Sequence, residues 1–577
     1  MNRKVESTRR QFCSTVAVGV LSAGFAKGES ERAADVVIVG GGLGGCAAAI
    51  AALRNELSVI MTEATDWIGG QLTSQGVPPD EHRWIETSGA NESYRDLRSR
   101  IRAHYRRRYP LTDAARNDPR LNPGNGNVSR LCSEPRVSLA VLEQWLAPFE
   151  QSGQLVLLRE HVATAADVDR DRVRAVTVRS TKTGDSRVLL GKYFIDGTEL
   201  GDLLPLTKTE FVIGSEARSE TNELHAGETA RPDNQQAFTI CFAVDHLPAE
   251  DHTIERPDEY AFWRDFAPEL TPPWPGKLLD FTYTHPRSGK PKRLGFDPTG
   301  GKSIAGALNL WTYRRIIDDS LFQRGRFASD ISLINWPQND YLLGNLVGVD
   351  NDEAERHIAR ARQLSLSLLY WLQTEAPRPD GGEGFPGLRL RGDLMGGPDG
   401  LAKAPYVRES RRIRAEFTVL EEHVGHEQRA MVVTGRTHAE IRRAIAAGDP
   451  LANVQAATFA DSVGVGSYSI DLHPSSGGDN YIDFASLRFQ VPLGSLLPVR
   501  MKNLIPAGKN IGATHITSGC YRLHPVEWGI GEAAGCLVAF AVRQKQSPRA
   551  IRANRQSLAS FQKYLRRQGV QTEWAAN

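Results

Sequence analysis

The sequence predicts an α/β fold in which a parallel central sheet is built from segments far apart in the chain. Residues 35–39 form a short, β-branched apolar run, typical of a strand buried on both faces. A glycine-rich loop and a helix-forming run over 46–53 follow at once, and residues 57–62 form a second strand. Near the other end of the chain, residues 504–511 read as a further buried strand, before a helix with Pro525 in its first turn.

The loop after the first strand spans residues 40–45, which are all glycine except Leu43. In a dinucleotide-binding fold, Gly40 permits the tight turn, Gly42 lets the backbone approach a pyrophosphate, and Gly45 lets the helix pack closely on the strand. The helix N-terminus then offers unpaired N–H groups and the positive end of its dipole to the phosphates. A glycine turn without any ligand has the same composition, so the loop alone is a weak signal.

The residues after the second strand strengthen the prediction of nucleotide binding. Glu63 stands where this fold needs a carboxylate to accept hydrogen bonds from ribose hydroxyls. The order strand, loop, helix, strand and acid therefore predicts a nucleotide site. Gly69-Gly70-Gln71 follows, and paired glycines allow the chain to run close against a bulky group.

A second signature lies at residues 193–202, where an apolar strand breaks into a turn of small residues. Together with the glycine loop and the acid before Gly-Gly-Gln, it resembles the glutathione-reductase-like flavoproteins and, within them, the FAD-dependent oxidoreductase family. The usual pattern is a strand followed by Asp-Ala-Thr-Gly. This chain departs from it with Gly197 for the alanine and Glu199 before the closing Gly201. We expect Asp196 and this turn to have a structural role.

The resemblance extends over most of the chain and implies FAD, not NAD, because the C-terminal segment returns to the nucleotide domain. It places the N-terminus of the closing helix beneath the N1–C2=O edge of the flavin, where the helix dipole stabilises the negative charge of reduced flavin. The expected cofactor-binding residues are Gly40, Gly42, Gly44, Gly45, Glu63, Gly69, Gly70, Gln71, Asp196, Gly508, Pro525 and Gly531. No metal site is predicted.

Candidate catalytic residues flank the predicted turn into the closing helix. Oxidation of an alcohol or amine carbon by flavin often needs a base to take the proton, and either His515 or His524 fits that role. Each histidine fits equally a turn residue bonded to the backbone. Arg522, between them, is expected to hold an anionic substrate group or a cofactor phosphate, or to form a structural ion pair.

Two further segments carry chemistry-bearing residues. Residues 408–412 hold three arginines, which suit either carboxylate or phosphate binding or a brace between lobes through groups such as Glu416. Residues 461–462 and 471–473, in a Gly/Ser-rich region, are expected to line the substrate lobe.

The predicted organisation is a Rossmann-like FAD domain that is discontinuous in sequence, with a mixed α/β substrate lobe inserted. The FAD domain takes 34–206, with a helical excursion and a surface loop over 86–131, and 495–546 as its closing segment. The substrate lobe takes 207–494, and one basic helix within 547–577 is expected to pack outside.

Residues 1–30 resemble an export signal of the twin-arginine type, with Arg9-Arg10 before Phe12 and a modest apolar run. Cys13 and Ser14 depart from the usual residues after the Phe, and an ordinary secretory signal or an uncleaved tail are the alternatives. We therefore expect an exported, periplasmic or extracytoplasmic protein without a stable membrane anchor. With 70 basic and 68 acidic residues the net charge is only +2, which disfavours nucleic acid as a partner.

The leading functional hypothesis is an oxidoreductase in which FAD accepts hydride from a CH–OH or CH–NH group of a small polar substrate. Electrons then pass to oxygen or another acceptor. A second hypothesis is a flavin-dependent reductase of a double bond that takes electrons from a partner. A third is a nucleotide-binding protein without turnover, which loss of the motif glycines or of Glu63 would have favoured.

Overall fold

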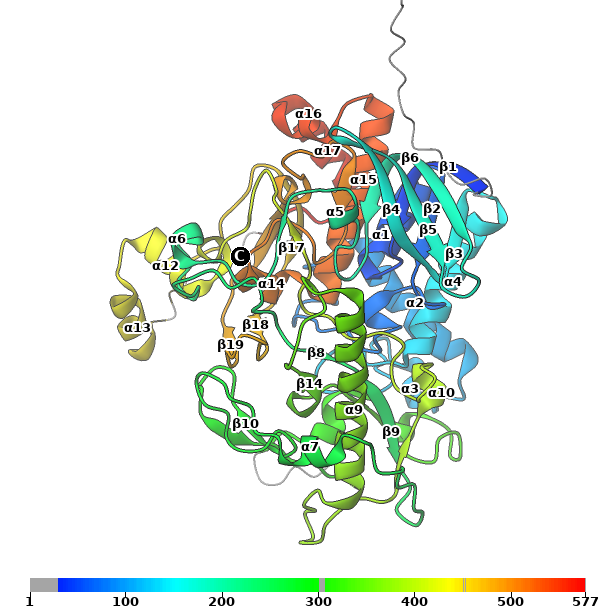
Figure 1. The fold of residues 1–577 in the computed structure, drawn as a ribbon, viewed down its shortest axis with the longest axis vertical. Helices are drawn as coiled ribbons and strands as arrows, with labels where there is room; N and C mark the ends of the chain where they lie inside the picture. The colour runs from blue at the N-terminus through cyan, green and yellow to red at the C-terminus, as the bar shows by residue number, and fades with distance from the viewer. Residues whose placement is uncertain (1–29, 300–306, 450, 452, 576–577) are drawn as a thin grey trace, which may run out of the picture.

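The computed structural model describes residues 30–299, 307–449, 451 and 453–575. The predicted export signal over residues 1–30 lies outside these ranges except for its last residue. The described chain forms two lobes, with the N-terminal and C-terminal segments together in one and the middle of the chain in the other (Figure 1).

The first lobe is organised by one parallel sheet, in which strand β1 from the start of the described chain and strand β21 from its C-terminal part both lie. The order across the sheet is β3-β2-β1-β6, and β21 pairs with the free edge of β6, so that Ile505 lies beside Ile195. All four of these pairings are parallel. This confirms the predicted α/β class and the return of the C-terminal segment to the sheet. The strands are β1 (Ser30–Val39), β2 (Val59–Glu63), β3 (Leu155–Arg159), β6 (Ser186–Asp196) and β21 (Leu504–Pro506).

The same sheet carries an antiparallel extension at the other end of β6. Strand β5 (Arg172–Ser180) pairs antiparallel with both β4 (His161–Asp169) and the first half of β6. The turn before β6 contains Gly184 with φ +79°, a conformation that favours glycine. This small antiparallel extension lies between the two signatures in the sequence.

Helix α1 (Leu43–Leu53) and helix α15 (His524–Gln544) pack against each other with their backbones in direct contact. A Cβ on Gly44 would overlap the carbonyl of Ala507, and a Cβ on Gly531 would overlap the carbonyl of Gly44. Gly535 lies equally close to the carbonyl of Ala48. The glycines of both helices therefore allow this close approach.

Helix α15 is also long and apolar enough, by composition, to cross a membrane. However, 94 % of its apolar stretch is buried inside the protein. It is the central helix of the first lobe, where it packs on α1, α2 (Glu92–Arg108), α16 (Pro548–Ala553) and α17 (Arg555–Arg567).

The second lobe is built on an antiparallel sheet with the order β12-β13-β9-β15. The long helix α9 (Asn351–Thr374) covers it, and the core between them is rich in aromatic side chains such as Trp263 and Trp336 (Figure 1). The strands are β9 (Phe242–His246), β12 (Arg315–Ile317), β13 (Ile331–Ile334) and β15 (Leu388–Leu390).

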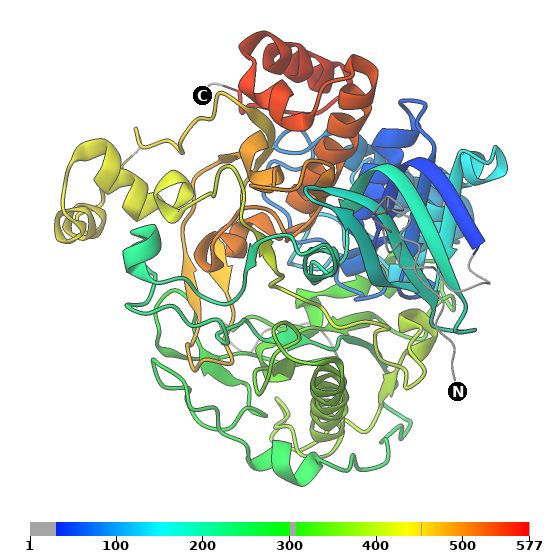
Figure 2. The ribbon, with the colours of Figure 1, turned by 45° about the horizontal axis from the view of Figure 1, so that its top comes forward.

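Short two-stranded ribbons and small helices complete the structure. The ribbons pair β7 (Phe211–Val212) with β16 (Arg412–Ile413), β8 (Phe238–Thr239) with β14 (Asp340–Tyr341), β10 (Thr282–Thr284) with β11 (Pro291–Arg293), β17 (Ser462–Gly466) with β20 (Phe489–Pro492), and β18 (Ile470–Leu472) with β19 (Ile482–Phe484). The other helices are α3 (Asp113–Asn117), α4 (Pro135–Gln151), α5 (Leu203–Leu206), α6 (Arg218–Thr221), α7 (Tyr260–Asp265), α8 (Leu310–Tyr313), α10 (Gly392–Met395), α11 (Glu421–Val424), α12 (His426–Thr434), α13 (His438–Ala446) and α14 (His515–Tyr521). Helices α12 and α13 project from the body in both views (Figure 1 and Figure 2).

Two segments differ from the sequence-based expectation. The loop that follows α3 is not a plain surface loop, because Leu121 and Leu131 are buried and Gly124 packs directly on the backbone of Arg315. The C-terminal segment forms two helices, α16 and α17, instead of one. Asn554 separates them and caps α17 by accepting a hydrogen bond from the N–H of Ser557 at 2.9 Å.

Candidate functional site

The glycine loop makes a tight corner between β1 and α1 and packs on the turn that follows β6. Gly40 has φ +95°, and a Cβ there would overlap the backbone of Thr198. A Cβ on Gly42 would lie 2.8 Å from the carbonyl oxygen of Gly197. A Cβ on Gly45 would overlap the carbonyl of Gly40, so this glycine lets α1 pack on β1 as predicted.

Asp196, at the end of β6, holds that turn together. Its carboxylate accepts hydrogen bonds from the N–H and Oγ1 of Thr198, at 3.1 and 2.7 Å, and from the N–H of Leu203 at 3.2 Å. Burial raises the pKa of Asp196 to about 7, against the effect of these donors. These contacts fit the structural role expected for this residue.

Glu63 lies at the end of β2 beside the glycine loop. One carboxylate oxygen accepts from the N–H and Oγ1 of Thr65, each at 2.9 Å, and the other lies 3.2 Å from the position of a Cβ on Gly41. Burial raises the pKa of Glu63 to about 7. The second oxygen is therefore placed at the loop, where a ribose hydroxyl would donate to it.

Residues 69–71 connect the loop to the N-terminus of α15. The N–H of Gly69 donates to the carbonyl of Gly41 at 2.7 Å, and Gly69 and Gly70 have φ values of +105° and +50°. The Gln71 amide donates to the carbonyl of Arg522 at 3.2 Å and also contacts the Glu527 carboxylate. A Cβ on Gly508, two residues after β21, would lie 3.4 Å from that carboxylate, and Pro525 lies in the first turn of α15.

A buried ionic cluster lies between these segments, and the sequence did not predict it. Lys509 bridges the carboxylates of Glu199 and Glu527, with 3.1 Å to the Glu527 oxygen. Glu527 also accepts from the N–H of Gly44 in the first turn of α1, at 3.3 Å. Burial raises the pKa of Glu527, and Lys509 opposes this effect. Glu199, the departure from the usual signature, lies between Gly42 and Gly70, with one oxygen that has no hydrogen-bond partner among the described residues.

These residues fit an FAD. The first N–H groups of α1 have no partners inside the helix, which makes this end of α1 a site for a pyrophosphate. The glycines form a cradle that side chains would fill, and Glu63 lies at its edge. Within the described ranges, one carboxamide oxygen of Gln71 and one carboxylate oxygen of Glu199 are buried without a hydrogen-bond partner, and the Glu199 oxygen lies beside Gly42 and Gly70. Lys509 would supply the cation near the phosphates.

The protein itself contacts both ring nitrogens of the candidate His524 and Nδ1 of the candidate His515. His524 is fully buried, with Nδ1 accepting from the N–H of Asp80 and Nε2 facing the carbonyl of Val77, each at 3.2 Å. Burial lowers the pKa of His524 to about 3, which keeps it neutral. Burial also opposes protonation of His515, but the Glu409 carboxylate, 3.0 Å from Nδ1, outweighs it and raises the pKa.

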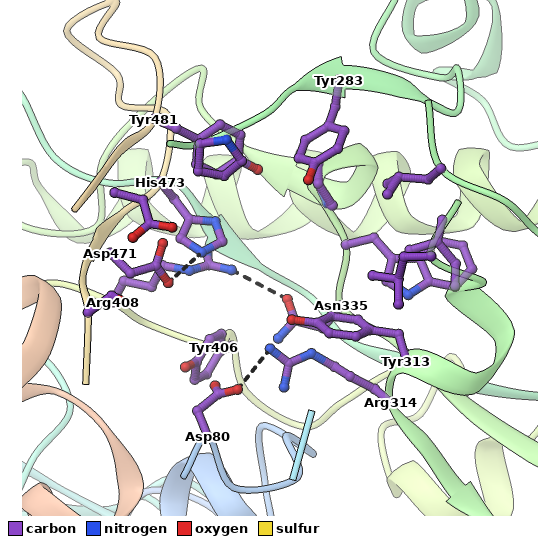
Figure 3. A pocket seen from close by; sticks show the side chains of 18 of the residues that line it. Asp80, Tyr283, Tyr313, Arg314, Asn335, Tyr406, Arg408, Asp471, His473 and Tyr481 are labelled. Atoms are coloured by element: carbon purple, nitrogen blue, oxygen red, sulfur yellow. Dashed lines mark hydrogen bonds and ion pairs between the residues drawn. The ribbon is translucent and has the colours of Figure 1, made fainter. Parts of the chain in front are cut away.

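Arg522 has a different environment, because it lines a cavity of about 270 Å³ between the two lobes. Its guanidinium donates to the Tyr406 hydroxyl at 3.2 Å and to the backbone carbonyl of Asp471 at 3.0 Å. Figure 3 shows side chains from both lobes pointing into the cavity, with Tyr283 and Tyr481 opposite Asp80 and its partner Arg314. Arg522 lines the cavity, and its backbone carbonyl accepts a hydrogen bond from Gln71 of the predicted flavin site. Asp80, nine residues after Gln71, lines the cavity too. The cavity therefore borders the predicted flavin site.

His473 is the titratable side chain best placed in this cavity. Its Nδ1 lies 2.6 Å from the buried carboxylate of Asp340, and its Nε2 lies 3.7 Å from that of Asp471. Arg408 in turn pairs with Asp340 at 2.9 Å. The sequence indicated only that residues 471–473 line the substrate lobe, because the partner that orients His473 is 133 residues away.

The arginines of residues 408–412 form buried ion pairs, but not with the predicted partner. Arg412 pairs with Glu409 at 2.6 Å and Glu216 at 2.9 Å, and Arg411 pairs with Asp202 at 3.2 Å. The expected partner Glu416 instead pairs with two arginines of α16, Arg549 and Arg552. The segment therefore braces the structure, and only Arg408 reaches the cavity.

Comparisons with known proteins support the same cofactor. The family model described as FAD dependent oxidoreductase matches residues 35–565. Among curated proteins no match to the chain was found. Among solved structures, a geranylgeranyl bacteriochlorophyll reductase-like protein from Thermoplasma acidophilum is 10% identical with a TM-score of 0.30, and the alignment covers 94% of this chain and 85% of that one.

Two further solved structures are similar in part. A variant of quinol fumarate reductase FrdA from E. coli is 11% identical, with a TM-score of 0.29 over 93% of this chain and 74% of that one. L-proline dehydrogenase from P. horikoshii is 15% identical, with a TM-score of 0.17 over 32% of this chain and 24% of that one. For several solved structures that it matches, the chain spans less than half of their length. Since the family model covers nearly the whole described chain, the protein belongs to the FAD-dependent oxidoreductase family and is an FAD-dependent enzyme.

Proposed function

We propose that this enzyme oxidises a CH–OH or CH–NH group of a small polar substrate bound in the cavity between the lobes, with His473 as the base. The observation that carries the proposal is the buried pair of His473 and Asp340, 2.6 Å apart, at the wall of a cavity bordering the flavin site. When bound, FAD supplies the acceptor for the hydride.

The pair fixes which nitrogen of His473 is free to act. Asp340 is fully buried; burial alone would raise the pKa of its carboxyl, but Arg408 and His473 outweigh burial and lower it. As a carboxylate, Asp340 can only accept a hydrogen bond, so Nδ1 of His473 carries the hydrogen and the neutral ring has its lone pair on Nε2. That nitrogen is within reach of a substrate O–H or N–H group placed in the cavity.

Asp471 and Arg522 complete the surroundings of His473. Burial would raise the pKa of Asp471, but His473 and Arg522 outweigh that effect and lower it. After taking a proton, the imidazolium of His473 would lie between two carboxylates, Asp340 and Asp471. Both stabilise its positive charge, which favours removal of the substrate proton as hydride leaves.

The rate of flavin reduction tests the role of His473. The purified holoenzyme is mixed anaerobically with alcohol and amine donors, and the loss of the oxidised flavin absorbance is followed across a range of pH. We expect His473→Asn to lower the rate constant at least ~100-fold. His438→Asn, which changes a half-buried histidine on α13 that pairs with Glu427, serves as the control and leaves the rate constant unchanged. Unaltered kinetics in the His473 variant would exclude it as the base.

We also propose that the cofactor is held as in the glutathione-reductase-like flavoproteins, and that the protein is exported. Residues 1–30, with their adjacent arginines and short apolar run, support export. Expression with Arg9 and Arg10 both replaced by lysine tests it: the protein should then remain inside the cell. Export of this variant at the normal level would argue against the twin-arginine route.

A further inference from the structure

The charged side chains that line the cavity neutralise one another in pairs. Arg314 lies 3.2 Å from Asp80, Arg522 lies 3.2 Å from Asp471, and Arg408 lies 2.9 Å from Asp340. A fourth pair joins Arg287 to Asp483 at 3.3 Å. A charged ligand would have to draw one of these groups away from its partner, which is costly when the partner stays buried. The cavity is therefore suited to an uncharged ligand.

Several polar atoms of the side chains that line the cavity have no hydrogen-bond partner in the described part of the protein. Among the described residues, the buried atoms at the cavity wall that have no hydrogen bond include donors and acceptors alike. A carboxylate only accepts and an ammonium only donates, whereas each hydroxyl does both. A ligand with several hydroxyls is the group that satisfies this mixture. The atoms are the donors Nε and Nη1 of Arg314, Nδ2 of Asn335, Nε1 of Trp336, and Nε of Arg408 and Arg522, and the acceptors Oδ1 of Asp483 and Oδ1 of Asp80, of which the latter has only its ion pair with Arg314.

Aromatic rings form the rest of the wall. Tyr283 and Tyr481 lie on one side, and Tyr313 and Tyr406 lie nearer to Asp80 (Figure 3). Such rings pack well against the C–H groups of a ring whose hydroxyls point outward, because each offers an apolar face and a polar edge. The volume of about 270 Å³ admits one such ring.

We propose that the cavity selects a neutral, polyhydroxylated ring compound of monosaccharide size, either free or at the end of a longer saccharide. This inference rests on the proposed function, since it names the substrate class of the same cavity. A hydroxyl-bearing carbon of that ring lies against His473, and the hydrogen removed as hydride leaves with the two electrons of the C–H bond. The hydroxyl proton passes to Nε2 of His473, FAD is reduced, and the product is a ketone or aldehyde of the sugar.

Equilibrium binding to the holoenzyme tests the proposal. Isothermal titration calorimetry under anaerobic conditions compares D-glucose, D-galactose and D-mannose with the charged analogues of each, the uronic acid and the 2-amino sugar. We expect at least one neutral sugar to bind roughly tenfold or more tightly than both of its charged analogues. The corresponding disaccharides identify a terminal residue as the ligand if they bind as well as the free sugar.

One hydrogen-bond donor of the cavity wall, the indole N–H of Trp336, can be removed while the aromatic ring is kept. Trp336→Phe keeps an aromatic ring and removes the unpartnered N–H, so the dissociation constant for the preferred sugar should rise about tenfold. Trp145→Phe, on α4 outside the cavity, is the matched control and should bind normally. Equal affinity of the Trp336 variant and the wild type would contradict the assignment.

Flavin absorbance in the same samples separates this inference from the proposed function. Sugar binding with flavin reduction supports both, and sugar binding without reduction leaves the ligand class intact but refutes the oxidation. Reduction by hydroxy acids or amines, with no binding of neutral sugars, overturns the ligand class while the oxidation stands. Failure of every neutral sugar to bind also overturns the inference.

Discussion

The glycine cradle makes a sharp prediction at Gly42, the residue that precedes α1. A Cβ there would lie 2.8 Å from the Gly197 carbonyl oxygen and 3.0 Å from a carboxylate oxygen of Glu199. Gly42→Ala therefore forces a small shift, with a cost of about 1–3 kcal/mol. Gly42→Asp adds a negative charge where the pyrophosphate must lie. At about 4 Å and an effective dielectric constant of about 20, that repulsion is about 4 kcal/mol.

The two variants together separate shape from charge. The charge should weaken FAD binding in Gly42→Asp by a further factor of roughly 10³ relative to Gly42→Ala, since about 1.4 kcal/mol corresponds to tenfold. Aspartate carries the same Cβ as alanine and is a favourable residue before a helix, so the apoprotein should be no less stable than that of Gly42→Ala. The measurement is the flavin-to-protein ratio after purification, followed by the dissociation constant of added FAD from flavin fluorescence.

Gly227→Asp is the matched control, because Gly227 is exposed with only the Thr229 carbonyl oxygen nearby, at 3.7 Å. It should retain a full complement of flavin. The reasoning would be refuted if Gly42→Asp purified with full flavin, or if it bound FAD as tightly as Gly42→Ala.

Other predictions follow from the same structure. Gly531→Ala should destabilise the protein by about 1–3 kcal/mol in denaturant unfolding, because its Cβ would overlap the Gly44 carbonyl. Gly529→Ala in the same helix should not, because its Cβ would make only an ordinary contact, 3.8 Å from the Asn91 amide nitrogen, and equal effects would contradict the packing. Glu199→Gln should lower the FAD dissociation constant by about tenfold or more, since it removes the carboxylate between Gly42 and Gly70; weaker binding in flavin titrations would show that Glu199 assists the cofactor. Burial, reinforced by nearby Glu216 and Glu421, raises the pKa of Glu223 to about 8, so this group's contribution to stability is complete below about pH 4.5 and is lost as the pH rises through 8. Glu223→Gln should flatten that part of the profile of unfolding free energy against pH, and a profile parallel to that of the wild type would refute the assignment.

The nucleotide half of the site was predictable because its signals are local. The turn at Gly40, the approach at Gly45 and the acid at Glu63 occupy one strand-loop-helix-strand unit, whose spacing is dictated by the backbone. The glycines of α15 were predictable for a related reason, since Gly531 and Gly535 lie one helical turn apart and must share a face. These contacts require no knowledge of distant residues.

The chemistry of the cavity was not predictable in the same way. His515 and His524 were placed correctly near the closing helix, but their partners, Glu409 and the backbone of Asp80 and Val77, come from elsewhere in the chain. The same is true of the partner that orients His473. A titratable residue becomes a base through its neighbours, and tertiary packing alone brings those neighbours together.

The break between α16 and α17 shows a local signal that was overlooked. Asn554 alone indicates the start of a helix, because asparagine is favoured at the position before the first turn. There its side chain accepts a hydrogen bond from the N–H three residues later, that of Ser557. By contrast, the bridge from Lys509 to Glu199 and Glu527 joins three segments that no local pattern connects. The sequence shows that Glu199 departs from the usual signature, but it does not indicate that the side chain lies between Gly42 and Gly70.

The central claim is that the flavin of this enzyme takes electrons from a substrate carbon in the cavity between the lobes. The most direct measurement is the anaerobic absorption spectrum of the bound flavin during titration with sugars, alcohols, amines and hydroxy acids. The account predicts that the oxidised flavin band disappears with at least one CH–OH or CH–NH donor in the wild type and persists in His473→Asn. A flavin that stays oxidised with every donor, yet after chemical reduction is reoxidised by an organic acceptor with a double bond, would contradict it and identify a reductase.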